Sequence, residues 1–231
     1  YTKELGSKSV IIKKINVFHL MGGYLMSVKK ILSAIAAVLI ITASVPAFAA
    51  GDIMLTVPDK EGGPSVLAAI SERASGKIFA RRDLSLKDLS TILWAAAGKN
   101  REEKGWTVPF AMGQEPYVNV YVLTSEGCYL YDWNKNMLKL LSDRKLLKKA
   151  GTQEYVGTAP VILVFGTKGS GPRIESWADV AVGAMSQNVY LAAEALGMKT
   201  RYVASFNKMT LIDALNIGPL SRIIAIMPIG Y

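Results

Sequence analysis

The spacing of hydrophobic residues after residue 64 predicts a mixture of helices and strands. Helices are expected over 65–72, between Ser85 and Gly98, and over 175–196, because apolar residues recur there every three or four positions. Ser85 is a good N-cap, and Gly98 and Gly197 stand where helices commonly end. The last helix is apolar around much of its circumference, so we expect it to be enclosed, either in the core or against a partner.

Strand patterns occupy the middle and the end of the chain. Residues 118–123, 127–132 and 137–141 are short segments joined by tight turns, which is typical of an antiparallel meander. Residues 159–165 are almost continuously apolar, and this predicts a central strand buried on both faces. A helical turn is expected at 146–150, a strand and turn at 197–206, a short helix capped by Asn207, and a final strand at 222–229.

Three segments lack such periodicity. Residues 50–64 contain Gly and Pro and are expected to form an arm. Residues 100–116 predict a long irregular connection, and loops of this length in compact domains are often functional. Residues 166–173 are rich in Gly but match neither the phosphate-loop nor the dinucleotide-binding pattern, so we interpret them as a plain connector.

The first 49 residues have the composition of a leader. Lys29 and Lys30 precede an apolar run at 31–42 and an Ala-x-Ala site at Ala47 and Ala49, which are the parts of a secretory signal peptide. The run is short for a membrane span, so we expect a signal peptide over 26–49 and cleavage after Ala49. A retained N-terminal membrane anchor is the alternative. Residues 1–25 are expected to be an upstream extension or a cloning remnant, 50–64 the arm, and 65–231 one domain. The mature protein would then be periplasmic or secreted.

Charge and reactive side chains narrow the possible functions. Residues 1–49 contain six Lys and one Glu, so their removal lowers the formal net charge from +9 to +4 and leaves no basic stripe for nucleic acid. The single histidine, His19, lies in the leader, which excludes Ser-His-Asp and Cys-His catalysis and disfavours a metal site. Cys128 lies in a strand pattern and is expected to be a buried small hydrophobe. An enzyme of this composition would depend on a cofactor.

The segment after the first helix carries the clearest candidate chemistry. Arg73, Ser75 and Lys77 fall on alternate residues, so in an extended chain their side chains point the same way. Two cations and a hydroxyl beside Gly76 suit an anion rich in acceptor oxygens, such as a phosphate. The alternative is an exposed helix end with solvated charges.

Four separated blocks together resemble the nitroreductase superfamily of FMN enzymes. Arg73, Ser75, Lys77 and Phe79 match its Arg-x-Ser-x-Lys motif, and a helix opening with Leu-Ser and ending in Trp-Ala-Ala-Ala-Gly follows. Residues 107–121 are similar to the family segment beneath the flavin ring, 183–193 to its central dimer helix, and 197–206 to a stretch that approaches the flavin. The resemblance covers 65–231, and the hairpin at 129–132 is most similar to the subgroup that includes peptide azoline dehydrogenases.

The resemblance implies an α+β nitroreductase-like fold, a mainly antiparallel sheet flanked by helices in a homodimer, and two-electron transfer at bound FMN. Arg73 and Ser75 would bind the FMN phosphate, and Lys77 would lie near flavin N1 and O2. The ring would contact Ala111, Met112, Gln114 and Ser205. The substrate would be a small molecule or a peptide.

Departures from the family pattern keep two alternatives open. The second motif position is Ala74, Phe110 stands where Ser is common, and no basic residue follows the last strand. One alternative is a cofactor-free binding domain on the same scaffold. The other is a related flavin enzyme whose electron donor is not NAD(P)H.

Overall fold

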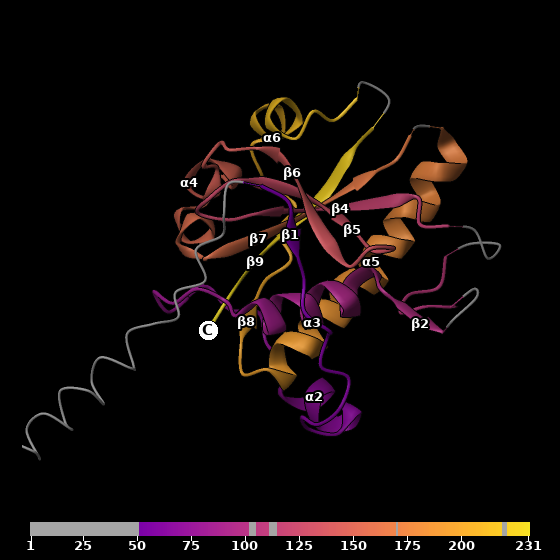
Figure 1. The fold of residues 1–231 in the computed structure, drawn as a ribbon, viewed down its shortest axis with the longest axis vertical. Helices are drawn as coiled ribbons and strands as arrows, with labels where there is room; N and C mark the ends of the chain where they lie inside the picture. The colour runs from indigo at the N-terminus through magenta and orange to yellow at the C-terminus, as the bar shows by residue number, and fades with distance from the viewer. Residues whose placement is uncertain (1–50, 102–104, 111–114, 170, 219–220) are drawn as a thin grey trace, which may run out of the picture. The chain divides into compact units, whose positions relative to one another are not determined.

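The computed structural model describes residues 51–101, 105–110, 115–169, 171–218 and 221–231. All described residues belong to one compact unit. They form an antiparallel sheet with helices on both faces, which confirms the expected α+β class (Figure 1). The predicted leader lies outside the described residues. Within them, no helix is both long and apolar enough to cross a membrane.

The main sheet has seven strands in the order β1, β6, β5, β4, β7, β9, β8, and all neighbouring strands are antiparallel. The predicted meander is present as β4, β5 and β6. A second sheet pairs two short strands, β2 and β3. The bounds are β1 Ile53–Met54, β2 Lys99–Arg101, β3 Gly105–Trp106, β4 Val118–Leu123, β5 Cys128–Asp132, β6 Met137–Ser142, β7 Val161–Thr167, β8 Lys199–Thr200 and β9 Ile223–Gly230.

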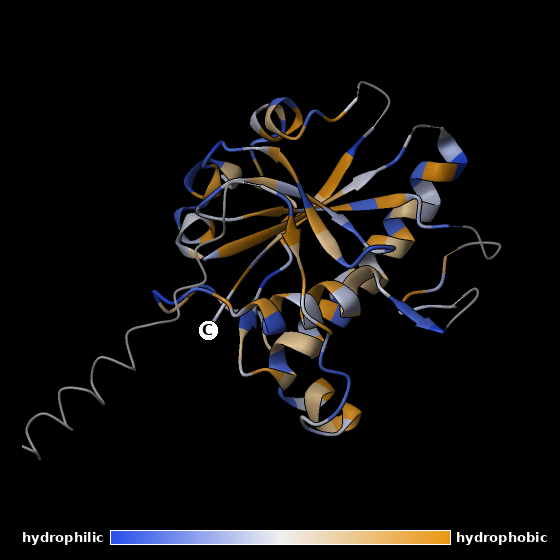
Figure 2. Cartoon of the chain, viewed as in Figure 1, coloured by the Kyte–Doolittle hydropathy of each residue, from blue (hydrophilic) through white to orange (hydrophobic). Residues whose placement is uncertain are grey.

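Strand β7 is buried along its whole length, as predicted, and it separates two hydrophobic clusters. Leu163 and Phe165 face the cluster covered by helices α3 (Leu86–Ala97) and α5 (Pro172–Ala195). Ile162 and Val164 face the other cluster, to which α4 (Leu147–Ala150) and α6 (Lys208–Ala214) contribute. The short 3-10 helix η2 (Glu154–Thr158) also belongs to the second side. Figure 2 shows the hydrophobic residues concentrated in the central strands between these helices.

Helices α2 (Val66–Glu72) and α3 both pack against α5. Ser65 and Ser85 cap α2 and α3 because their hydroxyls accept backbone N–H groups at 3.2 and 3.0 Å. Asn188 of α5 donates to the carbonyls of Ala95 and Thr107 at 3.1 and 3.0 Å. This amide fixes α5 to the end of α3 and to the segment that follows it.

The structure corrects the sequence-based boundaries in the segments expected to be irregular. Residues 53–54 of the expected arm pair with β6, and 99–106 contain the β2–β3 pair within the expected connection. Strands of two or three residues are too short to show periodicity. Helix α5 begins at Pro172, three residues before the predicted start, because proline suits the first turn of a helix. The predicted connector is therefore shorter, since β7 also includes Thr167.

Asn207 has a different role from the predicted cap. It stands at the N-cap position of α6, but its side chain makes no capping hydrogen bond. Instead its Nδ2 donates to the carbonyls of Lys149 and Gly151 at 2.7 and 3.0 Å. Asn207 therefore connects α6 to the chain around α4.

Cys128 on β5 is fully buried, as predicted, and its Sγ donates to the carbonyl of Arg144 at 3.2 Å. Burial raises the pKa of this thiol from 9.0 to about 11. The folded state therefore favours the neutral thiol more strongly than the unfolded chain does.

We expect this burial to make stability fall at alkaline pH. The buried neutral thiol makes its full contribution to the unfolding free energy below the unfolded pKa of 9.0. This contribution is lost as the pH rises toward 11. Between pH 7.5 and 10.5, urea titrations should show the parent losing about 1 to 2 kcal/mol more unfolding free energy than Cys128→Ala. Other ionising groups cancel in this difference, so identical losses in the two proteins would contradict the prediction.

Candidate functional site

The segment carrying Arg73, Ser75 and Lys77 runs beside the outer strand β8. Helix α2 ends at Arg73, whose backbone N–H still donates to Ala69, and the chain then becomes extended. Ser75 forms a parallel bridge with Thr200, and the Gly76 N–H donates to the Thr200 carbonyl at 2.9 Å. A Cβ atom at Gly76 would lie 2.7 Å from Cβ of Lys199, so only glycine permits this approach.

Arg73 presents a cation for which no described residue supplies a counter-charge. Its guanidinium carbon lies 4.6 Å from the ring centroid of Tyr190 on α5, so the cation covers the ring face. Its Nε is buried without an acceptor, and no described residue accepts a hydrogen bond from the remainder of the guanidinium. The terminal N–H groups are not buried and have no acceptor among the described residues, so an anion bound at that end of the guanidinium would supply acceptors for them.

Ser75 lies next to the same tyrosine. Its Oγ is 2.8 Å from the Tyr190 hydroxyl, and the backbone N–H of Tyr202 donates to that hydroxyl at 2.8 Å. Arg73 and Ser75 therefore share one contact residue, so their side chains lie on the same side of the segment. Lys77 was expected on that side as well, but it contacts Tyr155 of the opposite layer. Ser75 is exposed, and its hydroxyl is within reach of a ligand.

Lys77 continues the positive charge beyond Ser75. Its Nζ lies 5.7 Å from the ring centroid of Tyr155 in η2, and the guanidinium carbon of Arg201 lies 5.9 Å from the same centroid. Among the described residues, none of Arg73, Lys77 and Arg201 forms a salt bridge. The three cations therefore form an uncompensated basic strip along the outer edge of the sheet, which suits an anionic ligand.

Ser205 lies at the far end of this strip. Its hydroxyl is 2.8 Å from that of Thr152, and Gly151 forms a bridge with Phe206. The structure thus arranges Arg73, Ser75, Lys77 and Ser205 along the chain from 199 to 206, with α5 behind one end and the α4–η2 segment at the other. The predicted residues Ala111, Met112 and Gln114 lie outside the described residues.

A cleft of about 980 Å³ opens beside Lys77. The segment 77–81 forms one wall, and α4 and η2 form the other. Lys77, Arg81 and Lys148 contribute positive charge, and Glu154 is the carboxylate in its lining. The basic strip therefore borders a space large enough for a small organic ligand.

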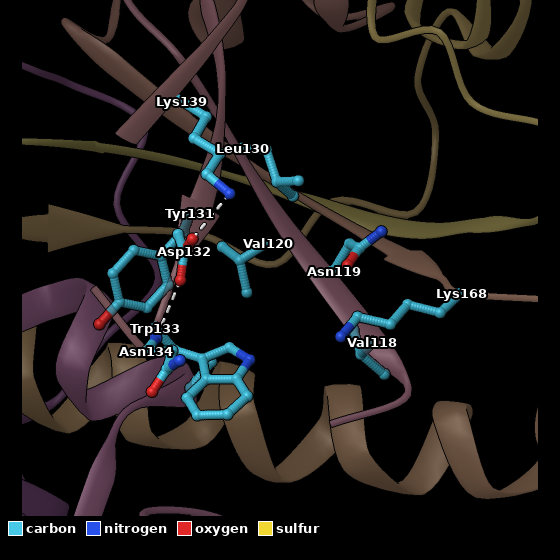
Figure 3. Close-up of a pocket in the computed structure, with 11 residues that line it drawn as sticks. Val118, Asn119, Val120, Leu130, Tyr131, Asp132, Trp133, Asn134, Lys139 and Lys168 are labelled. Atoms are coloured by element: carbon cyan, nitrogen blue, oxygen red, sulfur yellow. Dashed lines mark hydrogen bonds and ion pairs between the residues drawn. The ribbon is translucent and has the colours of Figure 1, made fainter. Parts of the chain in front are cut away.

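A second cavity, of about 240 Å³, lies where β4 and β5 diverge (Figure 3). Strand pairing between them begins only at Tyr121, so the space opens beside Val118 and Val120. Asp132 and Lys139 form a 2.8 Å ion pair at its wall. Lys168 enters from the end of β7, and desolvation lowers the pKa of its ammonium group. This cavity shares no lining residue with the basic strip.

Sequence reasoning missed four residues of the site. Arg201 belongs to the strip, and Tyr190, Tyr155 and Thr152 contact Arg73, Lys77 and Ser205. Each comes from an element far along the chain from Arg73. Tyr190 lies within the periodic pattern of the long helix, where an aromatic residue ordinarily indicates only core packing. Tyr155 and Arg201 belong to no motif. A cation beside an aromatic residue is visible only once the sheet brings the segments together.

A family model and a named relative each match most of the chain. The model of the family described as "Nitroreductase family" matches residues 70–231. A protein of Methanocaldococcus jannaschii, named as a nitroreductase, is 31% identical over 174 residues, which are 69% of this chain and 87% of that relative.

Two solved structures illustrate the likeness in fold. A protein from Ralstonia eutropha JMP134, also named as a nitroreductase, superposes with a TM-score of 0.72 at 32% identity, covering 78% of this chain and 88% of that one. The NADPH:FMN oxidoreductase of Vibrio harveyi, solved with NAD⁺, has a TM-score of 0.53 at 21% identity. It covers 73% of this chain and 69% of that one, and at this identity the likeness concerns the fold alone.

Proposed function

Since the chain belongs to the nitroreductase family, we propose that it is an oxidoreductase that binds FMN and transfers two electrons through it. The observation that carries the proposal is the guanidinium of Arg73, which has no acceptor among the described residues and lies beside the exposed hydroxyl of Ser75. A phosphate has both the charge and the acceptor oxygens that these groups lack. When bound, the flavin ring supplies the redox chemistry.

The residues in and beside the strip would each bind a different part of the cofactor. Arg73 and Ser75 would bind the phosphate, because an arginine offers several N–H donors in a fixed fork. Lys77 would lie at the N1 and O2 edge of the ring. Its positive charge would stabilise the negative charge that the ring gains there on reduction. Ser205, Ala111, Met112 and Gln114 would contact the ring. The cleft beside Lys77 would admit the substrate.

We further propose that the protein is a homodimer through α5. The side of α5 that the described fold leaves exposed carries Ser176, Val180, Gly183 and Gln187, and Val180 is 70% exposed. A Cβ atom at Gly183 would meet nothing within 4 Å, so packing within the described chain does not require glycine there. Close approach of a second helix would require it.

The absorption spectrum of the purified protein tests the proposed cofactor. We expect a flavin band and, after denaturation, release of FMN rather than FAD, because the strip suits one terminal phosphate. Mass spectrometry of the released compound identifies it. A colourless protein that excess FMN cannot reconstitute would contradict the proposal and favour a cofactor-free binding domain on this scaffold.

Two variants separate the roles of the cations. Arg73→Ala should weaken binding of oxidised and reduced flavin alike, because the phosphate charge does not change on reduction. Lys77→Ala should lower the reduction potential by about 30 to 60 mV, the equivalent of a charge-assisted hydrogen bond of about 1.5 to 3 kcal/mol. Spectroelectrochemical titration measures both. An unchanged potential in Lys77→Ala, or a comparable shift in Arg73→Ala, would show that the roles are wrongly assigned.

A bulky residue at position 183 tests the proposed interface. Gly183→Trp should be a folded monomer by light scattering at micromolar concentration, because the indole would occupy the space of the second helix. Met209→Trp on α6 is the matched control, since Met209 is 74% exposed and lies outside α5. We expect the control to remain dimeric. A dimeric Gly183→Trp, or a monomeric parent, would refute the interface.

A further inference from the structure

The Tyr190 hydroxyl joins three segments that are distant in sequence. Tyr190 belongs to α5 and is 9% exposed. Its oxygen lies 2.8 Å from Ser75 Oγ in the segment after α2 and 2.8 Å from the backbone nitrogen of Tyr202 in the chain after β8. One phenol group therefore contacts both chain segments that border the basic strip.

The hydrogen atoms that each group carries decide which group donates and which accepts in these hydrogen bonds. The backbone N–H of Tyr202 can only donate, so the Tyr190 oxygen accepts there. If Tyr190 donates its own proton to Ser75 Oγ, the proton of Ser75 remains available to a ligand. If Ser75 donates instead, the proton of Tyr190 has no further acceptor among the described residues. The first arrangement satisfies every proton once an anion is bound next to Ser75.

The ring of the same residue determines how Arg73 is presented. Its centroid lies 4.6 Å from the guanidinium carbon, so the ring occupies one face of the cation. The N–H groups of a guanidinium lie in its plane. The Nε N–H of Arg73 is buried, so the terminal N–H groups are the ones that a ligand can reach. Tyr190 thus contacts both proposed phosphate ligands while itself lying behind them.

We propose that Tyr190 is the positioning residue of the phosphate site: its hydroxyl turns the Ser75 proton toward the phosphate, and its ring supports Arg73. The inference rests on the proposed FMN function. It assigns no chemical step to Tyr190, which acts through Ser75 and Arg73. The site consequently depends on α5, which the opening motif of the sequence does not include.

Comparing FMN with riboflavin tests the role of the hydroxyl, because riboflavin has the same ring but no phosphate. Tyr190→Phe keeps the ring and removes the hydroxyl. We expect its dissociation constant for FMN, measured by quenching of flavin fluorescence, to rise about tenfold, while that for riboflavin stays unchanged. Tyr131→Phe is the matched control, since Tyr131 is also a buried tyrosine but lies on β5; it should bind both compounds like the parent.

A double-mutant cycle tests whether Tyr190 affects FMN binding through Ser75. If Tyr190 acts through Ser75, Tyr190→Phe should weaken FMN binding much less in a Ser75→Ala background than in the parent. Additive losses, or equal losses for FMN and riboflavin, would overturn the inference and assign Tyr190 a general structural role. Should Tyr190→Phe not fold, Ser75→Ala alone still decides: an FMN affinity equal to that of the parent would overturn the inference. A parent that binds no FMN would instead refute the proposed function, so the two failures are distinguishable.

Discussion

Burial of β7 on both faces is the constraint on which the other elements depend. A strand without an exposed face requires a hydrophobic layer on each side, and the chain supplies one with α3 and α5 and the other with α4, η2 and α6. The basic strip lies at the β8 edge, where both layers end. One layer provides Tyr190 behind Arg73 and Ser75, and the other provides Tyr155 beside Lys77 and Arg201. The site therefore requires both layers to be folded.

The strip stays positively charged because the carboxylates that form ion pairs lie beside other cations. The ion pairs among the described residues involve other cations, including Lys87 with Asp59 and Arg222 with Asp179, and all are at least partly exposed. The strip cations instead lie over aromatic rings. An aromatic face attracts a cation without neutralising it, so the positive potential remains available to a ligand.

Features that depend on a few neighbouring residues could be predicted from the sequence, whereas contacts between distant segments could not. The hydrophobic pattern was sufficient for the α+β class, the meander, the double burial of β7 and the burial of Cys128, because these depend on periodicity over several residues. The spacing of Arg73, Ser75 and Lys77 indicated a candidate anion site, and that assignment stays a prediction. The pattern was not sufficient for β1, β2 and β3, which are too short, or for Tyr155 and Tyr190, whose contacts depend on tertiary packing. Asn207 illustrates the same limit, because its amide donates to the carbonyls of Lys149 and Gly151, at the end of α4, and not to its own helix.

The segment from Arg73 to Ala80 also covers an exposed strand edge. Strand β8 is the last in the sheet, and the Gly76 N–H and the Ser75 bridge occupy its outer side at Thr200. Farther along, the Ala80 N–H donates to the Tyr231 carbonyl at 2.6 Å. An uncovered edge would offer its backbone groups to strands of other molecules. Residues of the candidate site thus also occupy this edge at Thr200, and a substitution that displaces them is expected to leave its backbone open to strands of other molecules.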